Sequence, residues 1–136
     1  MNPFTDAETD YLTRQRLGRI ATADPDGRPH VIPVGFKFLP DEGVVDVGGH
    51  FLSRSKKWRD LSRNPHIALV VDDLASVDPW TPRGIEIRGR AELHHTGGAD
   101  VGPGFEDARI RIHPERIIAW GLDAGPFEGA NSRNVP

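Results

Sequence analysis

The feature that most constrains this chain is the spacing of its turn signals, which separate short apolar segments. Residues 24–27 are Asp-Pro-Asp-Gly and residues 40–43 are Pro-Asp-Glu-Gly. In such turns proline presets φ and glycine closes the bend. The flanking segments, 19–23, 29–38 and 44–48, predict three antiparallel strands in a β-meander. With 15 glycines and 12 prolines among 136 residues, the composition argues against a helical bundle.

The rest of the chain predicts three further strands and two short helices. Thr5 and Glu8 form a capping-box pattern that begins the first helix, and Gly18 marks its expected end. A second helix is expected from Ser53 to Arg63, because Asn64-Pro65 stops it. The remaining segments predict a buried strand from His66 to Val71, a polar loop from Asp72 to Pro82, an alternating strand from Ile85 to Leu93, a glycine-rich loop from Thr96 to Gly104, and one long or two short strands from Ile110 to Leu122, hinged at His113-Pro114.

This order of elements predicts a mainly β fold. About six antiparallel strands in a chain of this length indicate a small closed or half-open barrel. A small polar tail follows from Asp123, and no internal repeat or second domain is visible. We therefore expect residues 1–136 to form one domain.

Composition and charge narrow the function classes. The chain has no cysteine, which excludes disulfides, a thiolate nucleophile and a zinc site built on sulfur. Its longest purely apolar run is Ile67 to Val71, and its acidic N-terminus is unlike a signal peptide, so we expect a cytoplasmic protein without a membrane partner. A net charge of −3 makes nucleic acid an unexpected partner.

The sequence shows no catalytic motif carried by side chains. The six histidines lack the spacing of a metal site, and no serine lies in a nucleophile elbow. There is no dinucleotide-binding or phosphate-loop glycine motif after a strand. We therefore name no metal ligand and no catalytic residue, and we expect a cofactor to supply the chemistry.

One segment, Ser53 to Lys57, concentrates the groups that bind phosphate. It follows Gly48-Gly49, opens the second helix and contains two of the three lysines of the chain. Hydroxyl groups, cationic side chains and the amides of a helix N-terminus all bind anions. From these residues alone, a phosphate site and a solvated basic helix face both remain open.

The order of motifs resembles the pyridoxamine 5'-phosphate oxidase-like flavoproteins. The motifs that carry this resemblance are Arg19 to Thr22, Asp26 to Phe36, Ser55 to Lys57, Asn64-Pro65 and Gly89 to Glu92. Three further stretches are similar to an actinobacterial branch described as PPOX-class probable coenzyme F420-dependent enzymes: Val71 to Trp80, Arg83 to Gly89 and Ser132 to Val135.

The resemblance implies a fold, an assembly and a site. The fold is a six-stranded antiparallel split β-barrel with short flanking helices, in a homodimer that holds its cofactor at the subunit interface. The phosphate run of the family falls on Ser55, Lys56 and Lys57. The ring-binding strand falls on Ile32, Pro33, Val34 and Gly35. Further cofactor contacts fall on His50, Phe51, Gly84, Trp120 and Arg133.

The function implied by the resemblance is that of a probable coenzyme F420-dependent oxidoreductase. It would transfer hydride between the deazaflavin and an unknown small organic substrate. An FMN-dependent oxidoreductase of the same fold and a non-catalytic flavin- or F420-binding protein remain as alternatives. We expect F420 to bind more tightly than FMN, because Arg54, Arg59 and Arg133 would form a basic track for its longer anionic tail. Trp80 and Trp120 are expected to cover apolar surface in the dimer.

Overall fold

The computed structural model describes all 136 residues and contains seven strands, two α helices and two short 3-10 helices. The elements in chain order are α1 Asp6–Arg14, β1 Leu17–Ala23, β2 Pro29–Leu39, β3 Val44–Gly48, η1 Leu52–Arg54, α2 Lys56–Arg63, β4 His66–Ser76, β5 Thr81–His94, η2 Gly98–Asp100, β6 Arg109–Trp120 and β7 Asn131–Asn134. No helix is both long and apolar enough to cross a membrane.

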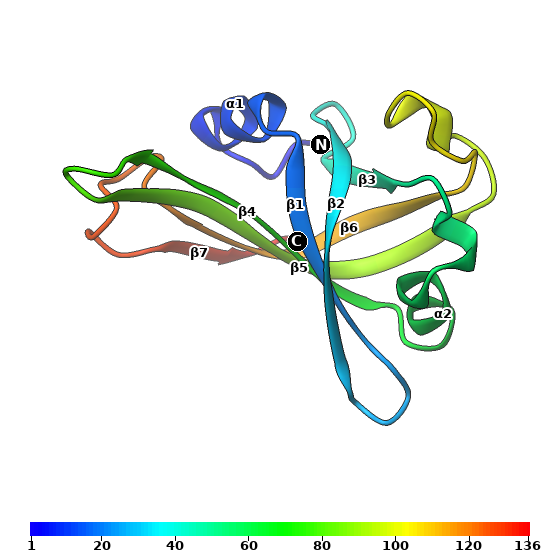
Figure 1. Cartoon of the computed structure of the whole chain (residues 1–136). Coiled ribbons are helices and arrows are strands. Elements are labelled where there is room, and N and C mark those ends of the chain that lie inside the picture. The colour runs from blue at the N-terminus through cyan, green and yellow to red at the C-terminus, as the bar shows by residue number, and fades with distance from the viewer.

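Strands β1 to β6 close into an antiparallel barrel. The hydrogen-bonded order is β3-β2-β1-β4-β5-β6-β7, and an additional β3–β6 pairing joins the two ends of the six-stranded part. The predicted meander is confirmed, because β2 pairs with β1 on one side and with β3 on the other. Figure 1 shows this barrel between the two helices. The predicted six-stranded split barrel is therefore correct, and β7 adds a seventh strand beside β6.

The barrel interior is filled by β-branched and leucine side chains from alternate positions of its strands. Ile20, Val45, Leu69, Ile87 and Ile112 are all completely buried. The alternation predicted for the fifth strand is confirmed, since Ile85 and Ile87 are buried while Arg88 and Arg90 are exposed. This alternation fixes the register, because a shift by one residue would turn these apolar side chains outward.

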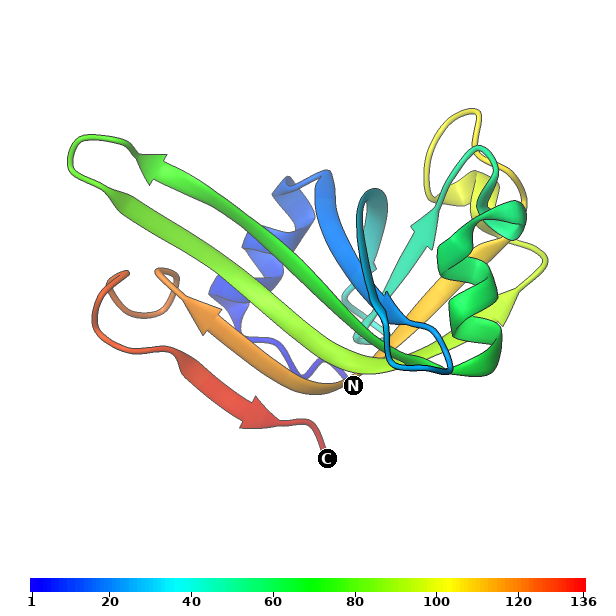
Figure 2. The same ribbon diagram turned by 60° about the horizontal axis from the view of Figure 1, so that its bottom comes forward.

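A long β4–β5 hairpin extends beyond the barrel, where the sequence predicted a polar loop from Asp72 to Pro82. Strand β4 continues to Ser76 and β5 begins at Thr81, with Asp73 opposite Arg83. Both figures of the whole chain show this arm projecting away from α2 (Figures 1 and 2). The prediction was wrong because polar residues are compatible with a strand whose face lies in water. Trp80 lies at the turn and is 58% exposed.

Two smaller expectations also need correction. Gly18 does not end α1 but lies buried in β1, where an added Cβ would come within 2.8 Å of the Leu69 side chain. The segment after Asp123 is not only a tail, because Asn131–Asn134 pairs with β6. The hinge at His113-Pro114 is a register irregularity within one continuous strand, opposite Arg88 and Gly89.

Candidate cofactor site

The start of α2 is organised by Ser55, the first residue of the predicted phosphate run. Its hydroxyl donates to the Leu52 carbonyl (2.6 Å) and accepts from the Trp58 amide (3.3 Å), which makes Ser55 the N-cap of the helix. The other first-turn amides of an α helix have no intrahelical acceptor. The helix N-terminus therefore presents free amides and a positive dipole end beside two lysines.

Lys56 forms an ion pair with a buried carboxylate of its own helix. Its Nζ donates to Asp60 Oδ1 at 3.0 Å, and the Thr22 hydroxyl of β1 donates to Asp60 Oδ2 at 2.9 Å. Burial alone would raise the pKa of Asp60, but the hydrogen bonds from Lys56 and Thr22 outweigh it, so the pKa is lowered. This network joins α2 to β1 and pairs Lys56 with the Asp60 carboxylate.

Lys57 differs from its neighbour, because it forms no ion pair and no side-chain hydrogen bond. The residue is half-buried, and burial lowers the pKa of its ammonium group. A partly desolvated cation without a partner is stabilised when an anion binds next to it. Within the predicted phosphate run, Lys57 is therefore the residue best suited to hold a phosphate.

The predicted ring-binding residues, Ile32 to Gly35, lie where β2 loses one of its neighbours. Strand β3 pairs only with Gly35 to Leu39, so the first half of β2 is paired with β1 alone. Pro33 is exposed and lies in this one-sided part. Proline is tolerated there because its missing N–H is not needed for a second ladder. The strand thus offers an open backbone edge to a ligand.

The segment after β3 carries the two predicted residues His50 and Phe51, both exposed, and leads directly to α2. His50 Nδ1 lies 3.0 Å from the Gly104 carbonyl, and its ring contacts Phe105 edge-on at a centroid distance of 5.3 Å. Phe105 was missed by the sequence analysis, which expected only a glycine-rich loop. A signal was present in Gly35 and Gly48, two glycines that leave space for a large side chain.

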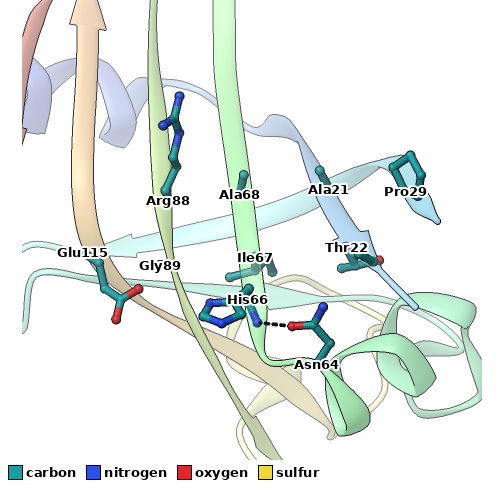
Figure 3. A pocket seen from close by; sticks show the side chains of 11 residues that line it. Ala21, Thr22, Pro29, Asn64, His66, Ile67, Ala68, Arg88, Gly89 and Glu115 are labelled. Atoms are coloured by element: carbon teal, nitrogen blue, oxygen red, sulfur yellow. Dashed lines mark hydrogen bonds between the residues drawn. The ribbon is translucent and has the colours of Figure 1, made fainter. Parts of the chain in front are cut away.

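A cavity of about 440 Å³ opens on the outer face of the sheet (Figure 3). Figure 3 shows Ala21 of β1, Ala68 and His66 of β4, and Arg88 of β5 around it. None of the predicted cofactor residues lines this cavity. Its residues are Ala21, Thr22, Ala23, Pro29, Asn64, His66, Ile67, Ala68, Arg88, Gly89 and Glu115.

A second hollow on the same face, of about 210 Å³, shares Ala21 and Ala68 with the first cavity and is mainly apolar. Trp120 lines it together with Val31, which is 65% exposed and precedes Ile32. Gly84 lies opposite Trp120 in the β5–β6 ladder, and an added Cβ would come within 2.6 Å of the indole. The structure therefore places Trp120 and Gly84 on the outer sheet face and not beside Lys57.

Arg133 is engaged elsewhere. Its guanidinium donates to the buried Glu8 carboxylate, with Nη1 3.1 Å from Oε2, and to the Pro3 carbonyl at 3.0 Å. Arg59 Nη1 also donates a hydrogen bond to the Arg54 carbonyl at 2.9 Å. Of the three arginines predicted to form a basic track, Arg54 lies just before α2 and Arg59 lies within it. Arg133 does not join them in one chain, because it is held on β7 beside α1.

Lys57 and the N-terminus of α2 present hydrogen-bond donors and positive charge, and the first half of β2 presents an open backbone edge. The barrel geometry places the chain in the split-barrel class. The chain belongs to the family described as "Pyridoxamine 5'-phosphate oxidase", whose model matches residues 4–121.

Two curated relatives support this membership. The chain is 38% identical over 133 residues to the 5a,11a-dehydrotetracycline/5a,11a-dehydrooxytetracycline reductase of Streptomyces rimosus, covering 98% of this chain and 94% of that protein. It is 30% identical over 101 residues to the pyridoxine/pyridoxamine 5'-phosphate oxidase of Streptomyces avermitilis, covering 74% of this chain but only 39% of the oxidase. The family and the reductase relative assign the chain to the oxidoreductases.

Solved structures share the fold at low sequence identity. A protein titled F420 Reductase aligns with a TM-score of 0.65 at 24% identity, covering 84% of this chain and 98% of that chain. A conserved hypothetical protein from Mycobacterium tuberculosis aligns with a TM-score of 0.66 at 23% identity, covering 86% and 84% of the two chains. These similarities confirm the barrel architecture.

Proposed function

We propose that this protein is a coenzyme F420-dependent oxidoreductase acting on a small organic substrate. The observation that carries the proposal is the unpartnered, half-buried Lys57 at the N-terminus of α2. The bound cofactor supplies hydride transfer at its ring, which no side chain of this chain can replace. The chain itself binds the phosphate through Lys57 and aligns the ring along Ile32 to Gly35.

The residues fit this cofactor in two respects. Lys57 and the free amides of α2 match an anionic group, while the open edge of β2 matches a flat ring. Arg54 is exposed beside the same helix and makes no side-chain hydrogen bond or ion pair, so it can meet a longer anionic tail. This residue favours F420, whose tail is longer and more acidic than the single phosphate of FMN.

A second copy of the chain completes the proposed site. Trp120 and Gly84 lie on the apolar outer face and not at α2 of the same chain. Apolar faces of this kind on a small protein commonly mark an interface. In a symmetric homodimer, this face of one protomer would lie against the ring-binding edge of its partner.

The proposed substrate class is a small molecule with a reducible conjugated carbon–carbon double bond. The curated relative from Streptomyces rimosus is a reductase of a dehydrotetracycline, and it matches 98% of this chain. Substrate loops differ between relatives more than scaffolds do, so the proposal extends to the bond type and not to the tetracycline skeleton.

Binding titrations test the cofactor assignment. Purified protein is titrated with F420 and with FMN, and fluorescence quenching gives both dissociation constants. We expect tighter binding of F420, and we expect Lys57→Ala to weaken binding by about 1.5–3 kcal/mol, the range for a hydrogen bond to a charged group. Turnover is then measured with reduced cofactor and a panel of conjugated enones.

Arg63→Ala is the matched control, because it removes an exposed, unpaired charge from the last turn of the same helix. Its effect on affinity should be small and should vanish at high salt. Tighter binding of FMN than F420 would overturn the cofactor assignment, and binding without turnover on any acceptor would favour a non-catalytic binding protein.

A further inference from the structure

The segment between η2 and β6 lies over the junction of β2 and β3. In Figure 1 the yellow segment after β5 reaches the end of β3. Phe105 is the large side chain of this segment, and its ring lies against three glycines. An added Cβ would come within 3.1 Å of the ring at Gly35, 2.6 Å at Gly48 and 2.8 Å at Gly102. The Phe105 ring therefore occupies space that side chains at these positions would fill.

Polar contacts hold this segment in place on both sides of Phe105. The Glu106 amide donates to the Gly49 carbonyl at 2.8 Å, and the Glu106 carboxylate accepts from the amide and hydroxyl of Ser53. The Ser53 hydroxyl bond is the main cause of the lowered pKa of Glu106, so the carboxylate is ionised at neutral pH. The His50 ring forms a hydrogen bond with the Gly104 carbonyl. The aromatic ring is thus fixed against the barrel.

Phe105 remains half-buried despite these contacts, and its neighbour His50 is exposed. The Phe105 ring lies against Gly35, where the open edge of β2 begins, and the chain from Gly48 leads from this point through His50 to Ser55 at the start of α2. An aromatic surface therefore borders the proposed ring position, and Lys57 marks the proposed phosphate position.

We infer that Phe105 is a ring-binding residue of this site, and that its side chain bounds the proposed ring position along β2 at the Gly35 end. The inference rests on the proposed function. Aromatic contacts stabilise flat ring systems, whereas they do not bind phosphate. Phe105 and Lys57 therefore determine affinity for two different parts of one ligand.

Titrations with paired ligands separate these two contributions. Each cofactor is compared with its phosphate-free ring compound, FMN with riboflavin and F420 with its ribityl deazaflavin core. We expect Phe105→Ala to weaken both members of a pair by the same factor, about 5- to 10-fold, the range of an aromatic contact. Lys57→Ala should weaken only the phosphate-bearing member.

Two control variants distinguish loss of the aromatic contact from a general disturbance of the structure. Phe105→Tyr keeps the ring and should retain wild-type affinity, and Phe127→Ala removes a phenylalanine that is 74% exposed and should change nothing. Thermal melting verifies that each variant is folded. Unchanged affinity of Phe105→Ala for the ring compounds, with a wild type that binds its cofactor, would overturn the inference alone. A wild type that binds neither FMN nor F420 would overturn the proposed function and the inference together.

Discussion

At the scale of single residues, Glu8 shows how a completely buried carboxylate is accommodated. It closes the predicted capping box by accepting from the Thr5 amide at 3.0 Å, and it accepts two hydrogen bonds from Arg133. The same side chain therefore begins α1 and attaches β7. Removing its cationic partner would leave a buried charge without compensation.

We predict that Arg133→Ala lowers the free energy of unfolding by about 3 kcal/mol, the scale for a broken buried ion pair. Chemical denaturation at neutral pH measures the change. Arg116→Ala, which removes only an exposed hydrogen bond to Asn134 on the same β6–β7 pair, should cost less than about 0.5 kcal/mol. Equal effects of the two substitutions would show that the Glu8 contact contributes little.

Lys57 provides a second prediction, on pH. Burial lowers the pKa of the free lysine, and a bound phosphate would raise it again. The contribution of this charge to phosphate binding is fully present below the lowered pKa of the free lysine and is lost as pH rises through the higher pKa of the phosphate-bound lysine. We therefore expect cofactor affinity to fall at alkaline pH in the wild type, but not in Lys57→Ala, when dissociation constants are measured between neutral and alkaline pH. Parallel pH profiles would contradict the assignment of Lys57.

At the scale of elements, a polar network attaches the β4–β5 arm to α1. Arg83 of β5 pairs with Asp73 of β4 at 2.7 Å, and the Tyr11 hydroxyl of α1 donates to the same carboxylate at 2.8 Å. The hydrogen bond from Arg83 is the main cause of the lowered pKa of Asp73. Burial, together with the hydrogen bond to the Asp73 carboxylate, raises the pKa of Tyr11, so the phenol stays protonated as a donor.

We predict that Asp73→Asn destabilises the protein by roughly 1 kcal/mol at neutral pH, a modest value because both ionic partners are about one-third exposed. Since the pKa of Asp73 is lowered on folding, its contribution is present above the unfolded pKa and is lost as pH falls through the folded pKa. Melting temperatures of the wild type and the variant should therefore converge in acid. Asp72→Asn, whose pair with Arg19 is exposed, is the control.

The elements also show what could be predicted from the sequence. The meander followed from local turn chemistry, and the second helix was predicted in the right place, although it begins at Lys56 and not at the predicted Ser53. The extended arm could not be predicted in the same way, because its polar residues are stabilised by partners across the ladder and by Tyr11. The position of Phe105 was also difficult to predict, because two of the three glycines that its ring contacts, Gly35 and Gly48, lie far away in the sequence.

At the scale of the whole molecule, the apolar outer face predicts association. Val31, 65% exposed, lies on this face beside Trp120. We expect sedimentation at micromolar concentration to give twice the 15.0 kDa mass of the chain. Val31→Asp should shift the protein toward the monomer, because a charge would have to be buried in the interface.

Phe127→Asp is the control for this substitution, since Phe127 is also an exposed apolar residue but belongs to the connection before β7. It should leave the sedimentation unchanged. If the wild type sediments only at the monomer mass, this result would contradict the proposed interface. It would also contradict the proposed contribution of Trp120 to a partner's site.

The one-sided pairing of β2 has a consequence for solubility. An unpaired strand edge can recruit a strand from another molecule and so begin aggregation. Pro33 lies in this edge and has no N–H to donate, which blocks such recruitment at its centre. Pro33→Val should therefore increase light scattering of the concentrated, cofactor-free protein at temperatures where it is still folded. The proline that leaves a strand open for a ligand would thus also prevent that strand from being extended by a neighbour.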